Sequence, residues 1–422
     1  MSKEFFLVMF VILAVVVFGI VYFRSRTLIP QSVSVEVDDK KATPEGVKSV
    51  VDANNQFALD LYSELKNGSG NIFFSPYGVS VALAMTYEGA RGETANEIQA
   101  VSHLPADGNL RQPSFAAIYR QINRLDSKYK LSIADAVWAQ NDYKFLDEYT
   151  NVLQQYYAGK ATNVDFKNST EESRQIINKW VGDKTDNKIN SLFSQGSPDN
   201  TARLVLTNAI YFKGAWLKKF EKAQTKDADF RVDADNIVKV PMMQQMDKDA
   251  KFNYAETDTL QILEMPYEGD KLSMIVLLPK NDSDMSLEGS LSLENIRNWR
   301  NEFREQHVDV FMPKFTFDIK YSLKEILMRM GMPLAFTWPG ADFSGMDGTK
   351  NLYIGDVVHQ VSIDIDENGA EAVAATGVAV VAGSAMPQQV PTFRADHPFI
   401  FAIQDKENGS ILFLGRVSNP SK

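Results

Sequence analysis

Few residues in this chain of 422 have the types and spacing that catalysis requires. There are four histidines, His103, His307, His359 and His397, and no two lie four positions apart, so the H-E-x-x-H pattern of a zinc-binding helix does not occur. The chain has no cysteine, which excludes thiolate nucleophiles, disulfides and cysteine-ligated metals. None of the 24 glycines belongs to a G-x-S-x-G, G-x-G-x-x-G or G-x-x-x-x-G-K motif. The sequence therefore predicts neither an enzyme nor a metal or cofactor site.

The remaining candidates for chemistry have simpler structural explanations. Asp364 and Asp366 form a carboxylate pair, but their alternation along an apolar segment is typical of the solvated face of a strand. His359 lies within the mainly apolar run 357–363, which favours a core histidine with a satisfied hydrogen bond over a catalytic or metal-binding one. Trp216 is expected to be a large core anchor.

The segment 363–386 has the most unusual composition in the chain. From Ala370 to Met386 its only charged residue is Glu371. Glycines at 369 and 383 and prolines at 387 and 391 bound this stretch, as in a loop. Such a run suits an element that can be either strand or exposed loop, although an Ala/Val-rich central strand or a flexible linker would have a similar composition. In a strand, alternate residues of this segment would lie on one face. One such face holds only uncharged residues without bulky groups, namely Ala370, Ala372, Ala374, Thr376, Val378, Val380 and Ala382.

Helical patterns dominate the first half of the chain, and strand patterns dominate the second half. Phe57, Leu61 and Leu65 recur at helical spacing, and Asn67-Gly68 ends that helix. This order indicates an α+β fold rather than alternating β-α-β units. Capping-box spacing predicts further helix starts at 94–97, 169–172 and 322–325. Apolar runs bounded by turn residues predict strands at 204–212, 274–278, 308–317, 399–403 and 411–417, the last two forming a hairpin.

The N-terminus carries a separate signal. Residues 5–23 form an unbroken apolar run of 19 residues, which as a helix would be about 29 Å long and match the hydrocarbon thickness of a bilayer. The run is longer than the apolar region of a cleaved signal peptide, and Arg24 and Arg26 follow it in place of a cleavage site. We therefore expect residues 1–26 to be an uncleaved signal anchor that makes the membrane a partner, with a cleaved signal peptide as the alternative. The basic residues weakly favour a cytoplasmic body.

Composition and charge define the rest of the organisation. Residues 27–49 are polar, include Pro30 and Pro44, and are expected to form a linker. From residue 50 onward there is no second linker, repeat or low-complexity stretch, so residues 50–422 are expected to form one domain. Lys and Arg total 44 against 54 Asp and Glu, a net charge of −10. This balance argues against a nucleic-acid partner, because general nucleic-acid binders need a basic surface.

Several motifs resemble those of the serpin family of serine protease inhibitors, over about residues 50–420. The string Glu367-Asn-Gly369-Ala-Glu371-Ala372 matches the family's hinge pattern E-x-G-[TS]-E-A, except that Ala370 replaces the usual Thr or Ser. Residues 393–403 fit the family's C-terminal signature, and residues 409–416 with Asn419-Pro420 continue it. Further matches are at 71–76, 207–216 and 312–315. Because these motifs occur in the family's order, the chain is identified as a member of the family.

The resemblance implies a serpin fold, with large mixed β-sheets, surrounding helices and an exposed reactive-centre loop at about residues 367–392. It also implies inhibition by suicide trapping. A serine protease cleaves the loop as a substrate, and the freed segment inserts into the main sheet while the acyl-enzyme persists. The positions that match functional ones in the family are the hinge (Glu367, Gly369, Ala370, Glu371 and Ala372), a buried polar cluster below the point where the sheet opens (Ser75, Asn208 and His359), and Trp216 under the point where the loop inserts.

The resemblance also locates the reactive bond. Counting from Glu367, as in family inhibitors, places the bond between Gly383 and Ser384, and Ala382 is a neighbouring candidate because the following segment is slightly longer than usual. Small residues at the bond suit shallow primary pockets, so elastase-like or subtilisin-like serine proteases are the expected partners of a monomeric inhibitor.

Two further expectations concern location and class. An inhibitor of exported proteases is most useful outside the cytoplasm, so we expect an extracytoplasmic serpin domain that is membrane-anchored, or secreted if the N-terminal segment is cleaved. The alternative class is a non-inhibitory serpin acting as a carrier or chaperone. Such proteins usually have bulky or charged hinge residues, whereas the hinge is small here.

Overall fold

The computed structural model describes residues 36–124, 128–281, 287–367 and 390–422. The helices are α2 (Pro44–Leu65), α3 (Pro76–Gly89), α4 (Gly92–Ser102), α5 (Gly108–Ile122), α6 (Asp147–Tyr157), α7 (Thr170–Lys184), α8 (Leu287–Ser290), α9 (Leu293–Asn301), α10 (Lys324–Met330) and α11 (Ser344–Asp347), with short turns η1 (Lys222–Gln224) and η2 (Leu334–Phe336). The strands are β1 (Ile72–Phe74), β2 (Tyr129–Gln140), β3 (Lys160–Val164), β4 (Leu204–Gly214), β5 (Lys226–Arg231), β6 (Ile237–Gln245), β7 (Lys251–Glu256), β8 (Leu260–Pro266), β9 (Leu272–Pro279), β10 (Arg304–His307), β11 (Asp309–Pro313), β12 (Phe315–Ser322), β13 (Ile354–Ile365), β14 (Thr392–Arg394), β15 (Phe399–Asp405) and β16 (Ile411–Val417).

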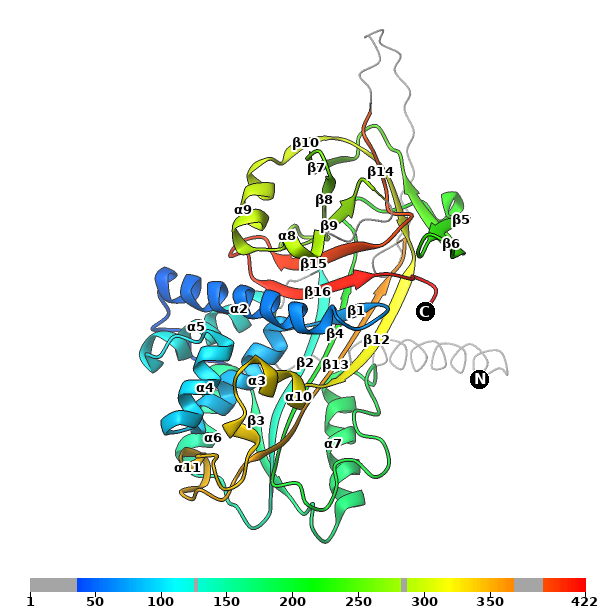
Figure 1. Ribbon diagram of the computed structural model, residues 1–422. Helices are drawn as coiled ribbons and strands as arrows, with labels where there is room; N and C mark the ends of the chain where they lie inside the picture. The colour runs from blue at the N-terminus through cyan, green and yellow to red at the C-terminus, as the bar shows by residue number, and fades with distance from the viewer. Residues whose placement is uncertain (1–35, 125–127, 282–286, 368–389) are drawn as a thin grey trace, which may run out of the picture. The chain divides into compact units, whose positions relative to one another are not determined.

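These strands form three sheets, and the predicted α+β fold is confirmed (Figure 1). One sheet has seven strands in the order β1-β16-β15-β9-β8-β7-β10, and a second has four in the order β14-β11-β6-β5. The third has five strands in the order β12-β13-β4-β2-β3. This five-stranded sheet is mixed, because β13 and β4 are parallel while β2 and β4 are antiparallel. The predicted C-terminal hairpin is present, with Phe399 of β15 opposite Val417 of β16.

The folded body begins before the boundary expected at residue 50. Helix α2 starts at Pro44, inside the polar segment 27–49 that the sequence suggested as a linker. Proline suits the first helical position, because its missing N–H needs no partner there, and Thr43 caps the helix by accepting a hydrogen bond from the Gly46 N–H at 3.1 Å. Upstream, Val37 is buried and the Asp38 N–H donates to the carbonyl of Gln155 at 2.8 Å. Residues 36–49 therefore belong to the folded body and not to a linker.

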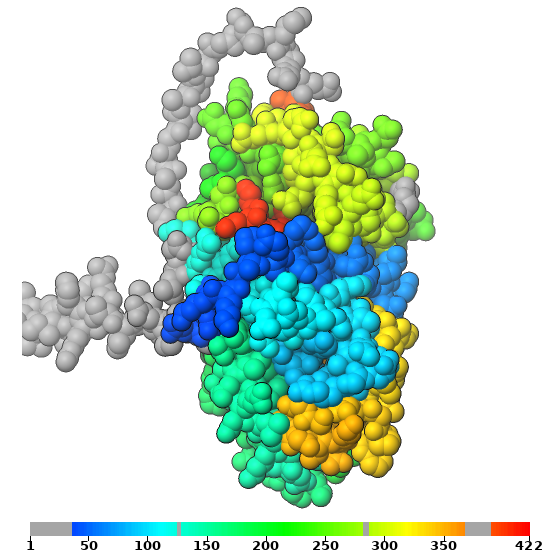
Figure 2. Space-filling model, turned by 90° about the vertical axis from the view of Figure 1, so that its left-hand side faces the viewer, coloured from blue at the N-terminus to red at the C-terminus, as the bar shows by residue number. Residues whose placement is uncertain are grey.

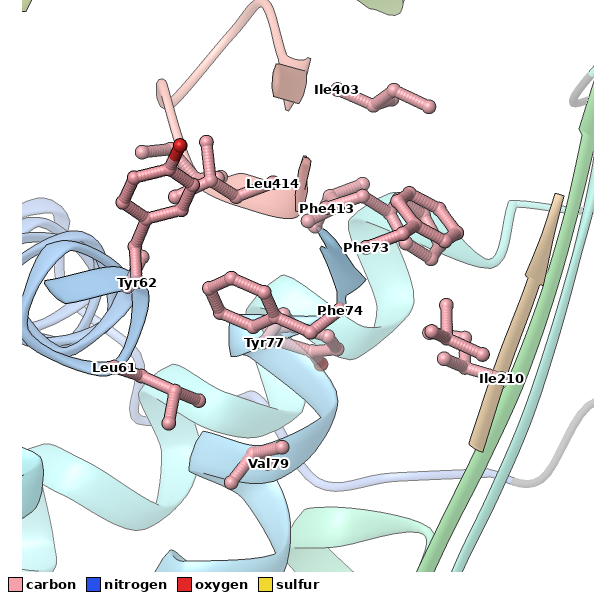
Figure 3. Packing of buried hydrophobic residues seen from close by; sticks show 14 of the residues in the cluster. Leu61, Tyr62, Phe73, Phe74, Tyr77, Val79, Ile210, Ile403, Phe413 and Leu414 are labelled. Carbon is pink, nitrogen blue, oxygen red and sulfur yellow. The ribbon is translucent and has the colours of Figure 1, made fainter. Parts of the chain in front are cut away.

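The core lies where helices α2 and α3 meet strands of two sheets (Figure 3). Phe73 of β1 stacks on Phe401 and Phe413, with 5.6 and 5.5 Å between ring centroids. Phe413 of the seven-stranded sheet also contacts Phe212 of the five-stranded sheet at 5.4 Å. Burial of each such side chain contributes about 1.5–3 kcal/mol. The two larger sheets therefore share one core.

The five-stranded sheet is covered on both faces. Its core face packs against α3, and its outer face carries an apolar cluster that includes residues of α7. In that cluster Trp138 of β2 and Trp180 of α7 meet edge to face at 5.5 Å. The connection after α7 is held by two reciprocal hydrogen bonds of 2.9 Å between the side-chain amide of Asn178 and the backbone of Phe193. A strand added to this sheet would have to fit between α3 and α7.

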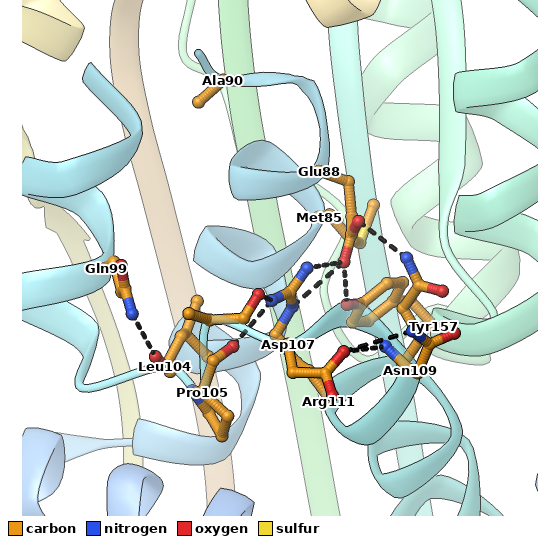
Figure 4. Close-up of polar contacts among 12 residues, drawn as sticks. Met85, Glu88, Ala90, Gln99, Leu104, Pro105, Asp107, Asn109, Arg111 and Tyr157 are labelled. Carbon is orange, nitrogen blue, oxygen red and sulfur yellow. Dashed lines mark hydrogen bonds and ion pairs between the residues drawn. The ribbon is translucent and has the colours of Figure 1, made fainter. Parts of the chain in front are cut away.

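A buried ion pair joins α3, α5 and α6 (Figure 4). Arg111 of α5 donates to Glu88 of α3 at 2.8 Å and to the carbonyl of Pro105 at 2.7 Å. Tyr157 of α6 donates its hydroxyl to Glu88 at 2.6 Å. Because these buried charges are paired and hydrogen-bonded, the cluster specifies how the three helices pack.

Figure 2 shows the helices near the start of the described chain, in blue to cyan, side by side on one face.

The membrane placement expected from the sequence has to be corrected. Residues 1–35, which contain the apolar run 5–23, lie outside the residues that the structure describes. Within the described ranges, no helix has both the length and the apolar character needed to cross a bilayer. The mainly apolar helix α3, for example, has 14 residues and is buried in the core. We therefore do not retain the membrane partner or the membrane-anchored localisation, nor the secreted alternative that depended on the same segment.

Candidate functional site

The segment expected to be reactive leaves the five-stranded sheet at the end of β13. Asp366 and Glu367 follow this strand and are the last described residues before the segment 368–389. The chain is described again from Val390, and β14 then joins the four-stranded sheet. The other hinge and cleavage positions expected from the sequence lie outside the described residues; they are Gly369, Ala370, Glu371, Ala372, Ala382, Gly383 and Ser384.

Glu367 ties the start of this segment to the body of the protein. Its side chain is only 4% exposed, and its two carboxylate oxygens accept hydrogen bonds from Lys314 Nζ at 2.7 Å and Thr225 Oγ1 at 2.8 Å. Its backbone carbonyl accepts from the Phe220 N–H at 3.1 Å. Burial by itself would raise the pKa of this carboxyl group, but the bonds from Lys314 and Thr225 outweigh burial and hold the pKa of Glu367 below its usual value. Glu367 is therefore a charged anchor at the hinge position.

Trp216 lies next to the same point of the chain. Its indole Nε1 donates to the backbone carbonyl of Asp366 at 2.9 Å. Its ring stacks on the buried Tyr267, with 4.5 Å between centroids and 13° between planes. Trp216 therefore lies in the core and against the residue that directly follows β13, and its place under the point where the loop inserts stays a prediction.

Strands β4 and β13 are adjacent and parallel, and we call this pair the β4–β13 seam. Their register runs from Leu204 opposite Ile354 to Phe212 opposite Ile363. Parallel pairing is slightly less stable per residue than antiparallel pairing. A segment that follows β13 and turns back along it would run antiparallel to both strands of the seam. The seam is therefore a place where a strand formed by the following segment could pair on both sides.

The predicted polar residues Ser75, Asn208 and His359 come together on the core face of the seam. Asn208 of β4 and His359 of β13 are opposite each other in the register, and Asn208 Oδ1 lies 2.5 Å from His359 Nδ1. Ser75, the N-cap residue of α3, donates its backbone N–H to His359 Nε2 at 3.0 Å and its hydroxyl to the carbonyl of Leu412 at 2.7 Å. A Cβ at Gly78 would lie 2.5 Å from Asn208 Nδ2, so only glycine fits beside this cluster.

The hydrogen-bond partners assign the protonation of His359. Because Nε2 accepts from the Ser75 N–H, the imidazole proton lies on Nδ1, which donates to Asn208 Oδ1. Burial lowers the pKa of His359 to about 3, so the ring is neutral. Both ring nitrogens are engaged and buried, so His359 is placed to hold strands together and not to act as a base.

The row continues to a residue that the sequence did not single out. Asn208 Nδ2 donates to Oδ1 of Asp135 on β2 at 2.5 Å, and Asp135 is opposite Asn208 in the register. Burial raises the pKa of Asp135 to about 7, although the bond from Asn208 acts in the opposite direction. One signal could have indicated this residue, since Asp135 is the only charged residue between 131 and 140. We call Asp135, Asn208 and His359 the polar row.

Comparison with known proteins decides the family. The family model described as Serpin (serine protease inhibitor) matches residues 52–420. An uncharacterized serpin-like protein of Thermococcus kodakarensis is 43% identical over 375 residues, which are 88% of this chain and 86% of that protein. Leukocyte elastase inhibitor of Bos taurus is 40% identical over 377 residues, which are 87% of this chain and 98% of that protein. This chain belongs to the serpin family.

A solved structure supports the same conclusion for the fold. Human thyroxine-binding globulin, crystallised as a ligand complex, matches this serpin with a TM-score of 0.80 and 28% identity, over 89% of this chain and 100% of that chain. The predicted serpin fold is therefore confirmed. The matched region begins within α2 and ends after β16, so the seam, the polar row and the Glu367 anchor all lie inside it.

Proposed function

We propose that this serpin is not an enzyme and inhibits serine proteases by suicide trapping. The hydroxyl of the protease serine attacks the carbonyl at the reactive bond, the new amino terminus leaves, and an ester joins protease and serpin. The freed part of the loop enters the β4–β13 seam as a strand and carries the attached protease with it. Insertion races hydrolysis of the ester, and each ~1.4 kcal/mol added to the insertion barrier slows insertion tenfold.

The β4–β13 seam is the observation that carries this proposal. It joins two parallel strands, and the segment that would enter it follows β13 directly. An inserted strand would replace one parallel pairing by two antiparallel pairings, which add backbone hydrogen bonds. The native state can then be kinetically trapped above a more stable inserted state.

The composition of the reactive segment supports the same reading. An inserted strand would lie between α3 and α7, where a buried unpaired charge would cost several kcal/mol. From Ala370 to Ala382, alternate residues are uncharged and none is larger than valine. Within this proposal Gly369, Ala370, Glu371 and Ala372 continue the hinge that Glu367 anchors.

The expected targets are elastase-like or subtilisin-like proteases. The candidate reactive bond, Gly383–Ser384, and its neighbour Ala382 present only small residues to a primary pocket. The related bovine protein is named a leukocyte elastase inhibitor, which fits the same preference. Trypsin-like enzymes, which prefer Arg or Lys, are expected to be poor partners.

A denaturing gel tests the proposal. We expect incubation with elastase or subtilisin to give a band at the summed size of protease and serpin, and incubation with trypsin to give none. Mass spectrometry of the released C-terminal peptide should show that it begins at Ser384 or one residue to either side. Cleavage with every protease but no covalent band would refute trapping.

A single substitution tests the position of the bond. In Gly383→Arg the residue before the cut would suit trypsin-like pockets, so we expect trypsin to gain a covalent band and elastase to lose most of its own. Gln388→Arg is the matched control, since it adds the same charge beyond the proposed bond. A trypsin complex with Gln388→Arg and not with Gly383→Arg would mean that the bond has to be moved.

A second candidate function is carriage of a small molecule, and a small apolar pocket is where such a ligand would have to enter. The pocket lies between the seven-stranded sheet, α2 and the α9 region, and its wall is mainly apolar, with Arg300 and Gln404 among the lining residues. The matching structure of human thyroxine-binding globulin is that of a ligand complex. We expect Ala402→Trp, which fills the pocket, to weaken binding of thyroxine in a fluorescence titration; absence of wild-type binding would remove this candidate for that ligand. The lining residues are Leu59, Ile262, Ile275, Leu277, Leu291, Ile296, Trp299, Arg300, Phe303, Ile400, Ala402, Gln404, Ile411 and Leu414.

A further inference from the structure

Residues 36–42 form a short segment that crosses from α5 to α6, and we call it the strap. Val37 is only 3% exposed. Its carbonyl accepts a hydrogen bond from Arg120 Nη2 of α5 at 2.7 Å, and Arg120 Nη1 pairs with the Asp39 carboxylate at 2.6 Å. Arg120 lies in the last turn of α5. One arginine thus docks two residues of the strap on the end of this helix.

The residue between them binds the neighbouring helix. The Asp38 N–H donates to the carbonyl of Gln155 in α6 at 2.8 Å, and Asp38 Oδ2 accepts from Gln155 Nε2 at 3.1 Å. Gln155 lies in the last turn of α6, where carbonyls have no partner within the helix. The strap thus supplies a donor to this helix end, and its successive residues alternate between α5 and α6.

Helix α5 belongs to the part of the molecule that carries β13. It packs so closely on α2 that a Cβ at Gly46 would lie 2.6 Å from Ser114 Oγ. Helix α2 is joined to α10 by the ion pair of Glu64 with Arg329 at 3.0 Å. The N-cap residue of α10, Leu323, donates its backbone N–H to a carbonyl of β13 at 2.9 Å. The elements α5, α2, α10 and β13 are therefore connected on one side of the β4–β13 seam.

Helix α6 belongs to the other side of the seam. Only Ala158 and Gly159 separate its last residue from Lys160, the first residue of β3. The Gly159 N–H donates to the carbonyl of Leu153 in the same helix at 3.2 Å, so this connection has no slack. Strand β3 is the edge of the half-sheet β4-β2-β3, across the seam from β13. Any movement of that half-sheet therefore carries α6 with it.

A strand that enters the seam has to widen the sheet between these two sides. Neighbouring strands lie about 4.7–4.9 Å apart, so the two sides separate by about that distance. The bonds of the strap to α5 and α6 are 2.6–3.1 Å long, and a hydrogen bond is lost beyond about 3.5 Å. They cannot all survive the separation. Inside the core α6 has a second tie, since Tyr157 donates to Glu88 of α3, and the strap is the outer of the two.

We propose that the strap is a catch that keeps the β4–β13 seam closed, and that it leaves α6 when a strand enters the seam. The inference deepens the proposed function and rests on it, because it needs the cleaved loop to insert. A contact that is made in the closed state and lost in the open state favours the closed state by the free energy of that contact. The strap therefore contributes to the kinetic trap that holds the intact protein.

Hydrogen–deuterium exchange of the whole chain, intact and cleaved, tests this inference directly. The protein is cleaved at the reactive bond by a catalytic amount of elastase, and a rise in its melting temperature reports insertion separately. We expect the Asp38 amide to lose protection by about tenfold or more on cleavage. The Val47 amide, which donates to the Thr43 carbonyl at 2.9 Å in the first turn of α2, is the internal reference and should keep its protection.

A matched pair of variants tests the energetic coupling. Val37→Asp places a charge where an apolar side chain is buried, so it should undock the strap in the intact protein. Its intact form should melt below intact wild type, whereas the two cleaved forms should melt alike because neither has a docked strap. Lys41→Asp introduces the same side chain at an exposed position of the strap and should melt like wild type in both forms. If Val37→Asp does not fold, the exchange of wild type decides alone.

The outcomes separate the strap from trapping. A cleaved protein that gains stability but keeps the Asp38 amide protected would overturn the role of the strap and leave trapping untouched. A Val37→Asp variant that lowers the melting temperatures of the intact and cleaved forms equally would do the same. Cleaved wild type without a gain in melting temperature would instead refute loop insertion, and the inference would fall with it.

Discussion

Glu367 is the described residue that most directly joins the reactive segment to the folded body. Glu367→Gln keeps the size of the side chain and its contact with Thr225 but removes the charge that pairs with Lys314. We expect the free energy of unfolding to fall by about 1–2 kcal/mol, at or below the lower end of the range for charged hydrogen bonds, because Lys314 is partly exposed. Urea unfolding at neutral pH measures this change.

The pH dependence of the same variant checks the cause. The folded-state pKa of Glu367 lies below its usual value of 4.5, so the stabilisation is present above that pH and is lost as the pH falls through the lower folded-state value. Wild type and Glu367→Gln should therefore converge in acid. Asp364→Asn should stay within about 0.5 kcal/mol of wild type at neutral pH. An equal loss of stability for Glu367→Gln at every pH would show that the charge is not responsible.

Ala370 is the residue at which insertion is expected to begin. Ala370→Arg would force a guanidinium into the sheet or delay insertion until it reached water, and either effect adds several kcal/mol to the insertion barrier. We expect the variant to fold and to be cut at the same bond, but to release the protease, so the gel shows cleaved serpin without the covalent band. Ala370→Ser is the control and should still form the complex. Full complex formation by Ala370→Arg would move the hinge elsewhere.

At the scale of residues, the sequence predicted only those site residues that the resemblance to the family identifies. Ser75 and Asn208 lie within family motifs and His359 matches a family position, so the resemblance predicted that the three residues meet. Asp135 could not be found in this way, since its partner Asn208 is 73 positions away and only the pairing of β2 with β4 brings them together. A lone charge in an apolar strand was a signal of burial but carried no information about its partner.

At the scale of elements, the first helix offers a clear test. Thr43 caps α2 by accepting from the Gly46 N–H. Thr43→Ala removes the only side-chain oxygen at this cap, and we expect the free energy of unfolding to fall by about 1 kcal/mol. Thr43→Ser keeps the oxygen and should be close to wild type. If Thr43→Ala and Thr43→Ser lose the same stability in urea unfolding, the loss comes from the methyl group and not from the cap.

Local patterns predicted the existence of elements better than their ends. Ser169 occupies the N-cap position of α7, as predicted, but its side chain makes no capping hydrogen bond. Thr94 lies inside α4, which begins at Gly92, and its hydroxyl accepts from the Asp342 N–H at 2.9 Å. A tertiary contact thus uses the residue that the capping pattern assigned to a helix start. The β4–β13 seam could not be predicted from local patterns either. Its parallel pairing joins Asn208 to His359 across 151 positions, and no local pattern specifies which strands become neighbours.

At the scale of the whole molecule, the proposed mechanism requires two folded states of unequal stability. In the intact chain β4 pairs with β13 directly, and both ends of the segment 368–389 are tied down, by Glu367 at one end and by β14 at the other. A cut at the reactive bond frees one end. The released segment can then pair antiparallel with both seam strands without moving β14.

The stability of the cleaved protein is therefore the most general test. Each backbone hydrogen bond gained contributes about 0.5–1.5 kcal/mol net, and an inserted strand gains such bonds on both sides. We expect protein cleaved at the reactive bond by a catalytic amount of elastase to melt well above the intact protein in calorimetry, by more than the roughly 1 °C that 1 kcal/mol produces in a domain of this size at about 2.1 cal/mol/K of unfolding entropy per residue. Ala370→Arg, cleaved in the same way, should gain less because its hinge enters the sheet poorly. Cleaved wild-type protein that melts at or below the temperature of the intact protein would mean that the segment does not insert, and the seam would then have no role in inhibition.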